Sequence, residues 1–334
     1  MKTLRNILVL ADGFAAPSYT PRLRFLCQYL SKHGYRVQVV TEHIHPLLFE
    51  HDYPIEEIAV YHGKGLLGMV DWAIKNILSL LFDYKNRYFS RQVENMFGHQ
   101  AWDIVFCTTF HTFPLRAAVT FAHKHHIPVV LDLRDIIEQA PANHQDYLAH
   151  HSAWLSPFVR PFQNINRRRR NRWLSKANAV TCVSPWHKQM LKSINLDTHL
   201  IYNGFDETVF SPVHCPSPAF ILSYTGKYFG LPMQDICPLL EALQSIDIPY
   251  RFEIHTQPEG KKRLLPLLQQ YGLGAHCSLG DYIPLSQTID LYHRSSIIIA
   301  LSNKAADNNV HGMMTTKFFE ALGVEKPLLL VRSD

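Results

Sequence analysis

The chain has 334 residues, of which 47% are apolar and 18% are charged, and its formal net charge is +5 at pH 7. This length predicts two domains of roughly 150 residues each, and this composition excludes an intrinsically disordered chain. No uninterrupted apolar run reaches the roughly 18 to 20 residues of a membrane-spanning helix, and no convincing cleavage site marks a signal peptide. We therefore expect a cytoplasmic protein.

In residues 1–203, short apolar runs rich in β-branched residues alternate with segments of helical length. The strands predicted from these runs are residues 6–10, 36–41, 103–108, 128–133, 179–183 and 200–202. Continuous apolar strands that alternate with amphipathic helices indicate a parallel sheet covered on both faces. We therefore expect the first domain, residues 1–203, to be a doubly wound α/β domain.

The loop after the first strand is a candidate binding loop, because ligands of open α/β sheets bind at the carboxyl ends of the strands. Gly13 permits a close approach of the backbone to a ligand, and a helix predicted to start near Thr20 or Pro21 offers amide groups to an anion. Arg22 and Arg24 are near enough to reach a phosphate. An ordinary strand-to-helix turn with solvated arginines explains the same residues.

Two segments of the first domain bear on membranes. Residues 65–84 form a broad apolar face that includes Trp72, with Asp71 and Lys75 interrupting it, and Arg167, Arg168, Arg169 and Arg170 form a basic run on a predicted helix. Together they predict contact with the inner leaflet of a membrane or with a phosphorylated, lipid-linked acceptor. A partly buried helix and a solvated basic face remain alternatives. Because aromatic platforms and a nucleic-acid reader motif are lacking, no nucleic-acid partner is expected.

The segment 201–218 turns at Asn203–Gly204 and continues through a polar, proline-bearing stretch, which is typical of a linker. The alternation of strands and helices then restarts. The strands predicted in this second half are residues 220–224, 250–255, 277–279, 297–301 and 327–331. We expect a second Rossmann-like domain over residues 204–334.

A loop followed by a helix N-terminus near the end of the chain is a candidate phosphate site. Thr315 and Thr316 lie at the predicted start of this helix, and Lys317 and Glu320 lie in its first turns. A carboxylate at this position can bind the vicinal hydroxyls of a ribose, whereas a capping role for Glu320 is the alternative.

Six segments, in this order, resemble glycosyltransferase family 4: GYRVQVVT, PVVLDLRD, ANAVTCVS, IYNGFD, ILSYTGKYFG and TTKFFEALGVEKPLLLV. The family contains retaining enzymes of bacterial polysaccharide and lipopolysaccharide assembly. The resemblance implies a GT-B fold, in which two Rossmann-like domains face each other across a cleft. It also implies transfer of a sugar from a nucleotide sugar, held by the second domain, to a carbohydrate or lipid-linked acceptor.

Individual residues match the family's donor site in part. Glu320 matches the glutamate that binds the ribose, while the position of the family's other glutamate falls on Gly312. Gly226 and Lys227 match a glycine and arginine pair, but the second basic residue of the family is absent at Pro232 and Met233. Lysine lacks the bidentate fork of arginine. The resemblance therefore assigns the donor diphosphate to Lys227, Lys317 and backbone amides.

For the acceptor side, His111 and Asp135 are the candidate catalytic groups, and each follows a predicted strand of the first domain, Asp135 beside Arg134. A polar loop histidine at His111 and an ion pair between Asp135 and Arg134 are the alternatives. No cofactor or metal is expected, because basic side chains and helix N-termini can neutralise the leaving diphosphate. The departures from the family leave two alternatives open, a nucleotide-sugar epimerase and a catalytically silent GT-B binding protein. The chain also stops directly after a predicted strand, where family members continue, so we expect a short or truncated second domain.

Overall fold

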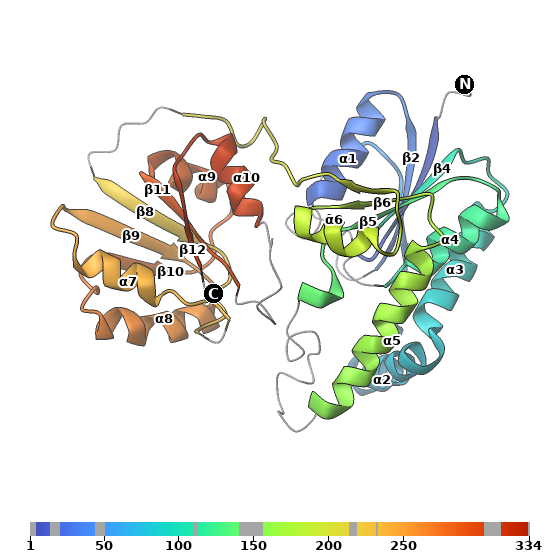
Figure 1. The fold of residues 1–334 in the computed structure, drawn as a ribbon, viewed down its shortest axis with the longest axis horizontal. Helices are drawn as coiled ribbons and strands as arrows, with labels where there is room; N and C mark the ends of the chain where they lie inside the picture. The colour runs from blue at the N-terminus through green and yellow to red at the C-terminus, as the bar shows by residue number, and fades with distance from the viewer. Residues whose placement is uncertain are drawn as a thin grey trace. The chain divides into compact units, whose positions relative to one another are not determined.

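The computed structural model describes residues 5–13, 21–43, 51–109, 112–139, 156–213, 219–231, 233–303 and 315–332. The chain divides into two compact units, residues 1–202 and 203–334 (Figure 1). Each unit has its own parallel sheet, and the two units are described separately below. Both are α/β units, as the alternating pattern predicts.

The first unit contains a seven-stranded sheet in the order β3-β2-β1-β4-β5-β6-β7, in which all neighbours are parallel. Its strands are β1 (Asn6–Ala11), β2 (Arg36–Glu42), β3 (Ile55–Ile58), β4 (Ile104–Thr109), β5 (Val129–Leu133), β6 (Ala179–Cys182) and β7 (Thr198–Leu200). Its helices are α1 (Pro21–Lys32), α2 (Gly65–Phe82), α3 (Tyr84–Phe97), α4 (Leu115–Lys124), the short 3₁₀ helix η1 (Ile137–Gln139), α5 (Ser156–Leu174) and α6 (Pro185–Lys192).

The central strand β1 shows why these strands are continuously apolar. Leu8 and Leu10 point into a core that includes side chains from α3, α4, α5 and α6, whereas Ile7 and Val9 point to the opposite face, against Leu23 of α1. Both faces of the sheet are therefore covered, and after the half-buried Asn6 all residues of β1 are buried and apolar.

The second unit contains a five-stranded parallel sheet in the order β10-β9-β8-β11-β12. Its strands are β8 (Phe220–Thr225), β9 (Tyr250–His255), β10 (Cys277–Gly280), β11 (Ile297–Leu301) and β12 (Leu328–Val331). Its helices are α7 (Cys237–Gln244), α8 (Pro258–Gln270), α9 (Leu285–Arg294) and α10 (Thr316–Gly323). Side chains of α7 and α8 share a core with Leu222, while side chains of α9 and α10 share a separate core with Ile298.

Two strands differ from the sequence-based expectation. Strand β3 was not predicted, because its four residues, IEEI, include Glu56 and Glu57. This strand lies at the edge of the sheet, where polar side chains are tolerated. Strand β7 covers Thr198–Leu200, whereas the prediction was residues 200–202.

Candidate functional site

Ligands of open parallel sheets bind at the carboxyl ends of the strands, where the strand order reverses. In the second unit this point lies between β8 and β11, and in the first unit it lies between β1 and β4. The residues that follow these strands are therefore the candidates in each unit.

In the second unit, Gly226 and Lys317 come together at this point. Gly226 follows β8 with a backbone φ of +126°, and a Cβ atom built on it would lie 2.6 Å from the Lys317 Nζ atom. Glycine adopts this backbone conformation readily, and a side chain here would displace the end of the Lys317 side chain. Burial lowers the pKa of Lys317, while the charge of Glu320 raises it. The exposed Lys227 follows directly in the same loop.

Glu320 is held by side chains of two other elements. The Tyr292 hydroxyl donates a hydrogen bond of 3.3 Å to Glu320 Oε2, and it shares a 2.7 Å hydrogen bond with Thr225 at the end of β8. Burial raises the pKa of Glu320, while Lys317, Tyr292 and Thr316 lower it. Thr315 is the N-cap of α10, so Glu320 lies beyond the first turn and not at the third helical position that a capping-box glutamate occupies.

The loop after β8 is fixed by hydrogen bonds to its backbone. The Tyr228 amide donates to Thr256 Oγ1 (3.2 Å) and Gln257 Oε1 (3.0 Å). The Phe229 amide donates to Gln234 Oε1 (2.9 Å), and the Gln234 side chain in turn donates to Asn303 Oδ1 (2.8 Å), after β11. The loop therefore has a defined conformation across the two strands that flank the point of reversal.

Arg263 of α8 also reaches this loop, and sequence reasoning did not identify it. Its guanidinium donates to the Phe229 carbonyl, and its Cδ atom would lie 3.1 Å from a Cβ atom built on Gly230. It brings an arginine to the loop whose sequence lacks the second basic residue of the family. On α8 it follows Lys261 and Lys262, so no sequence pattern distinguishes it from a solvated cation.

In the first unit, Asp12, Arg134 and Asp135 lie at the carboxyl ends of β1 and β5. Arg134 is buried and forms an ion pair with Asp12, and Thr109 at the end of β4 donates a 3.4 Å hydrogen bond to Asp12. Gly13 follows Asp12 and is buried. Desolvation raises the pKa of Asp135 to about 6; Arg134 opposes this shift, and Asp12 adds to it. Asp135 is therefore a carboxyl group that can exchange a proton near neutral pH.

Arg22 has a structural role that the sequence did not predict. Its guanidinium forms a 3.0 Å ion pair with the buried Asp132 and donates to the carbonyls of Ile201 (2.7 Å) and Tyr202 (2.8 Å). Thr108 and Thr181 donate further hydrogen bonds to Asp132. These bonds occupy Arg22, which corrects the expectation that it could reach a phosphate.

The four arginines of the basic run have different environments. Arg167 and Arg168 are exposed, and Arg169 donates to carbonyls of the last turn of α2. Arg170 is only 1% exposed and forms a 2.6 Å ion pair with Glu138. The expectation that all four contact a membrane or an acceptor is therefore wrong for Arg170. Trp72 is 52% exposed on α2, and His111 and Gly312 lie outside the described residues.

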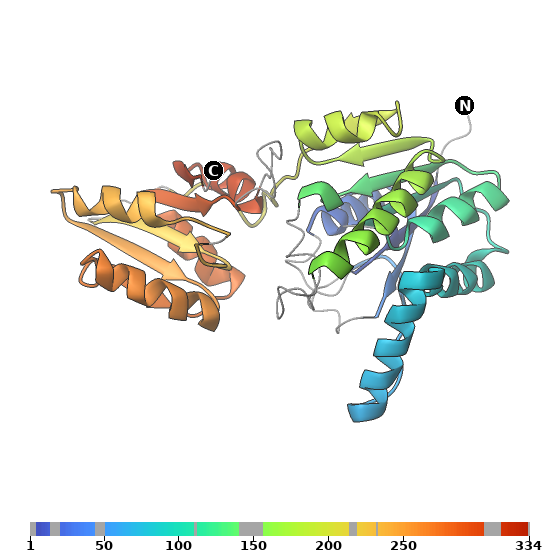
Figure 2. The ribbon, with the colours of Figure 1, turned by 60° about the horizontal axis from the view of Figure 1, so that its bottom comes forward.

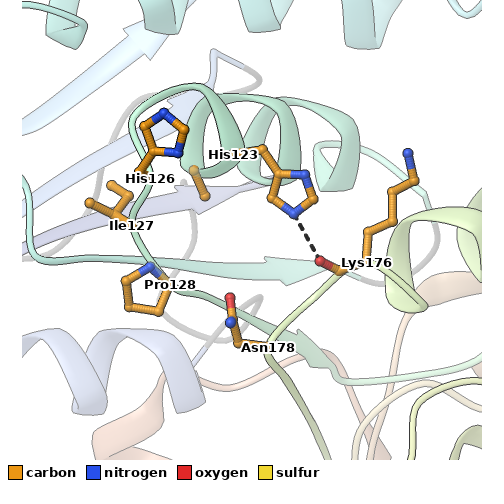
Figure 3. A pocket seen from close by; sticks show the side chains of 7 residues that line it. His123, His126, Ile127, Pro128, Lys176 and Asn178 are labelled. Carbon is orange, nitrogen blue, oxygen red and sulfur yellow. Dashed lines mark hydrogen bonds between the residues drawn. The ribbon is translucent and has the colours of Figure 1, made fainter.

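A separate open hollow of about 570 Å³ lies at the amino-terminal ends of strands in the first sheet (Figure 3). Its lining includes Pro128 and Asn178, which precede β5 and β6, and His123 Nε2 lies 3.0 Å from the Lys176 carbonyl oxygen. This is the amino-terminal edge of the strands, away from the point of reversal. Among the described residues, no group of three or more His, Cys, Asp or Glu side chains could hold a metal ion.

Comparisons with known proteins support the fold described above. A family model described as Glycosyltransferase Family 4 matches residues 22–209. Among curated protein sequences no significant match is found. Several solved structures share the fold over nearly the whole chain, at sequence identities that show the fold alone.

Three of these structures are glycosyltransferases of the GT-B fold. Sucrose-phosphate synthase from Thermosynechococcus elongatus has a TM-score of 0.63 at 14% identity, with 98% of this chain and 81% of that chain covered. HepE from Anabaena, in complex with UDP-glucose, has a TM-score of 0.59 at 14% identity (98% and 80%). The lipopolysaccharide outer core galactosyltransferase WaaB has a TM-score of 0.58 at 10% identity (97% and 80%).

Proposed function

Because the chain belongs to glycosyltransferase family 4, whose model matches more than half of it, we propose that it transfers a sugar from a nucleoside diphosphate sugar to a carbohydrate or lipid-linked acceptor. The observation that carries the proposal is the cluster of Gly226, Lys317 and Glu320 at the strand reversal of the second unit. At this place a cation can bind the phosphates of a nucleotide, and a glycine lets the backbone approach them closely. A carboxylate can accept hydrogen bonds from the ribose hydroxyls.

The donor diphosphate is assigned to Lys317, Lys227 and the N-terminus of α10. The low dielectric around Lys317 strengthens its attraction for a phosphate, and the dipole of α10 adds to it. Glu320, held by Tyr292, accepts hydrogen bonds from the ribose hydroxyls. These cations neutralise the departing diphosphate, so the proposal needs no metal ion. The fold shared with HepE makes UDP-sugars the first donors to test.

The acceptor is assigned to the first unit, where Asp135 lies next to Arg134 after β5. With its raised pKa, Asp135 can take the proton of an acceptor hydroxyl, and the donor phosphate can do the same in a retaining reaction. We place the reaction in cell-envelope polysaccharide synthesis, on the cytoplasmic side of the membrane. The fold shared with WaaB supports this assignment.

The first test is calorimetric titration with UDP, GDP and their sugar conjugates. We expect one nucleotide to bind, and Glu320→Ala to weaken its binding about tenfold, which is about 1.4 kcal/mol. Glu241→Ala, on the exposed side of α7, is the matched control and should bind as the unchanged chain does. If the folded chain binds no nucleotide, it is a silent relative. If it converts the donor without an acceptor into an epimeric nucleotide sugar, it is an epimerase.

A further inference from the structure

Helix α2 exposes an unusual amount of apolar surface. Its exposed large apolar side chains are Leu66, Leu67, Met69, Val70, Trp72, Ile74, Ile77, Leu81 and Phe82. None of its side chains is buried, and the helix projects from the first unit (Figure 2). With 18 residues it is about 27 Å long. An apolar surface of this size on a soluble protein marks a binding surface.

The polar side chains of α2 point toward the protein instead of toward water. Asp71 and Lys75 form a 2.9 Å ion pair, Lys75 donates to the Val60 carbonyl (2.9 Å), and Asp71 accepts from the His62 amide (2.7 Å). The Tyr61 hydroxyl donates to Asn76 (3.3 Å). A helix on the surface of a soluble protein normally has the reverse arrangement, with its apolar side inward.

Basic side chains adjoin the C-terminal end of α2. Arg169 of α5 donates to the carbonyls of Ser79 (3.0 Å) and Leu80 (2.8 Å), which holds this part of α5 at the last turn of α2. Arg167 and Arg168, on the same turn of α5, are exposed. The surface therefore combines an apolar helix face with neighbouring cations.

We propose that α2 docks on an anionic lipid surface, with its outer face among the acyl chains and Arg167 and Arg168 at the headgroups. The outer face of α2 consists of the exposed apolar side chains named above, and among them Trp72 alone carries a hydrogen-bonding group. Indole rings favour the membrane interface. An interface with a protein or with a second copy of this chain would need hydrogen-bonding groups at its rim. Anionic lipid also complements the two arginines.

The helix lies in the interface and does not cross the bilayer. By length and composition alone, α2 is apolar enough to span a membrane in spite of Asp71 and Lys75. A spanning position would, however, carry the backbone of residues 60–62 into the hydrocarbon, because this segment is hydrogen-bonded to the polar side of α2. Exposed backbone groups of irregular segments are not tolerated there.

Flotation of the full chain with vesicles tests the proposal, and it needs neither donor nor acceptor. We expect binding to phosphatidylcholine vesicles that contain phosphatidylglycerol. Leu67→Glu and Ile74→Glu should each weaken this binding at least about tenfold. Leu196→Glu is the matched control, because Leu196 is 84% exposed and Leu67 is 79% exposed, and it should bind as the unchanged chain does. Equal thermal melting of the variants would show that they fold.

Two further measurements test whether anionic lipid is the partner of α2 and how deeply α2 lies in the bilayer. Arg167→Glu with Arg168→Glu should lower binding to the anionic vesicles and leave binding to pure phosphatidylcholine unchanged. The Trp72 fluorescence is the part of the signal that Trp72→Phe removes. Lipids brominated near the headgroup should quench it more strongly than lipids brominated near the chain ends. Absence of vesicle binding, an equal loss in Leu196→Glu, or stronger quenching by the deep label would overturn the proposal. Self-association that Leu67→Glu abolishes, without vesicle binding, would assign the face to a second copy instead.

Discussion

Asp135 lies after β5 in surroundings that disfavour its charged form. Its pKa is raised from 3.8 to about 6, chiefly by desolvation. The folded state therefore holds the proton more tightly than the unfolded state, and stability is lost as the pH rises from about 4 through 6, on the order of 2 to 3 kcal/mol. We expect Asp135→Asn to remove this loss, so the variant should melt higher than the unchanged chain at pH 8 and differ less at pH 4. Sugar transfer should fall in the same variant, and unaltered transfer would remove Asp135 from the acceptor site.

Gly226 combines a positive φ with the close approach of Lys317. We expect Gly226→Ala to lower the free energy of unfolding of the second unit by about 1 to 3 kcal/mol, because a side chain there strains the backbone. It should also weaken nucleotide binding, because the Lys317 ammonium group must move. Gly272→Ala is the control, since Gly272 has a φ of +66° but its added Cβ atom would meet nothing within 4 Å. This control should lose stability and keep its nucleotide affinity, as measured by denaturant unfolding and calorimetry.

At the scale of elements, α8 contributes Arg263 to the loop after β8. We expect Arg263→Ala to weaken UDP binding about three- to tenfold, because the loop loses both a cation and a bond to the Phe229 carbonyl. Binding of uridine, which has no phosphate, should not change. Arg263→Lys should restore part of the affinity by charge alone, and the neighbouring exposed Lys262→Ala should have no effect. A loss that is equal for uridine and UDP would indicate a purely structural role.

Elements with strong periodic patterns could be predicted from the sequence, and those governed by tertiary contacts could not. The apolar run of β1 predicts a strand because both of its sheet faces are covered. Strand β9 is predicted by alternation, since Tyr250, Phe252 and Ile254 are buried between polar residues that are exposed or half-buried. The sequence pattern does not predict strand β3, because its edge position tolerates two glutamates. Nothing in the sequence indicates that Arg170 turns inward to Glu138 or that Arg22 binds Asp132, since both partners are distant along the chain.

At the scale of the whole molecule, two reversals of strand order place candidate residues in each unit. The sequence predicts Lys317 and Glu320 from a loop followed by a helix N-terminus, and Gly226 through the resemblance to the family. It cannot predict that the Lys317 ammonium group lies close to Gly226, because this depends on how α10 packs against β11, the neighbour of β8. The cations at this site come from three elements: Lys227 from the loop after β8, Lys317 from α10 and Arg263 from α8.

This distribution of charge predicts a reaction that does not depend on a divalent metal. Lys227, Lys317, Arg263 and the N-terminus of α10 can together balance the negative charge that develops on a leaving diphosphate. We therefore expect transfer rates to be unchanged by EDTA and to rise less than about twofold on addition of Mg²⁺, because no step requires it. Activity that EDTA abolishes and Mn²⁺ restores would show that the cations of the second unit are insufficient for the leaving group.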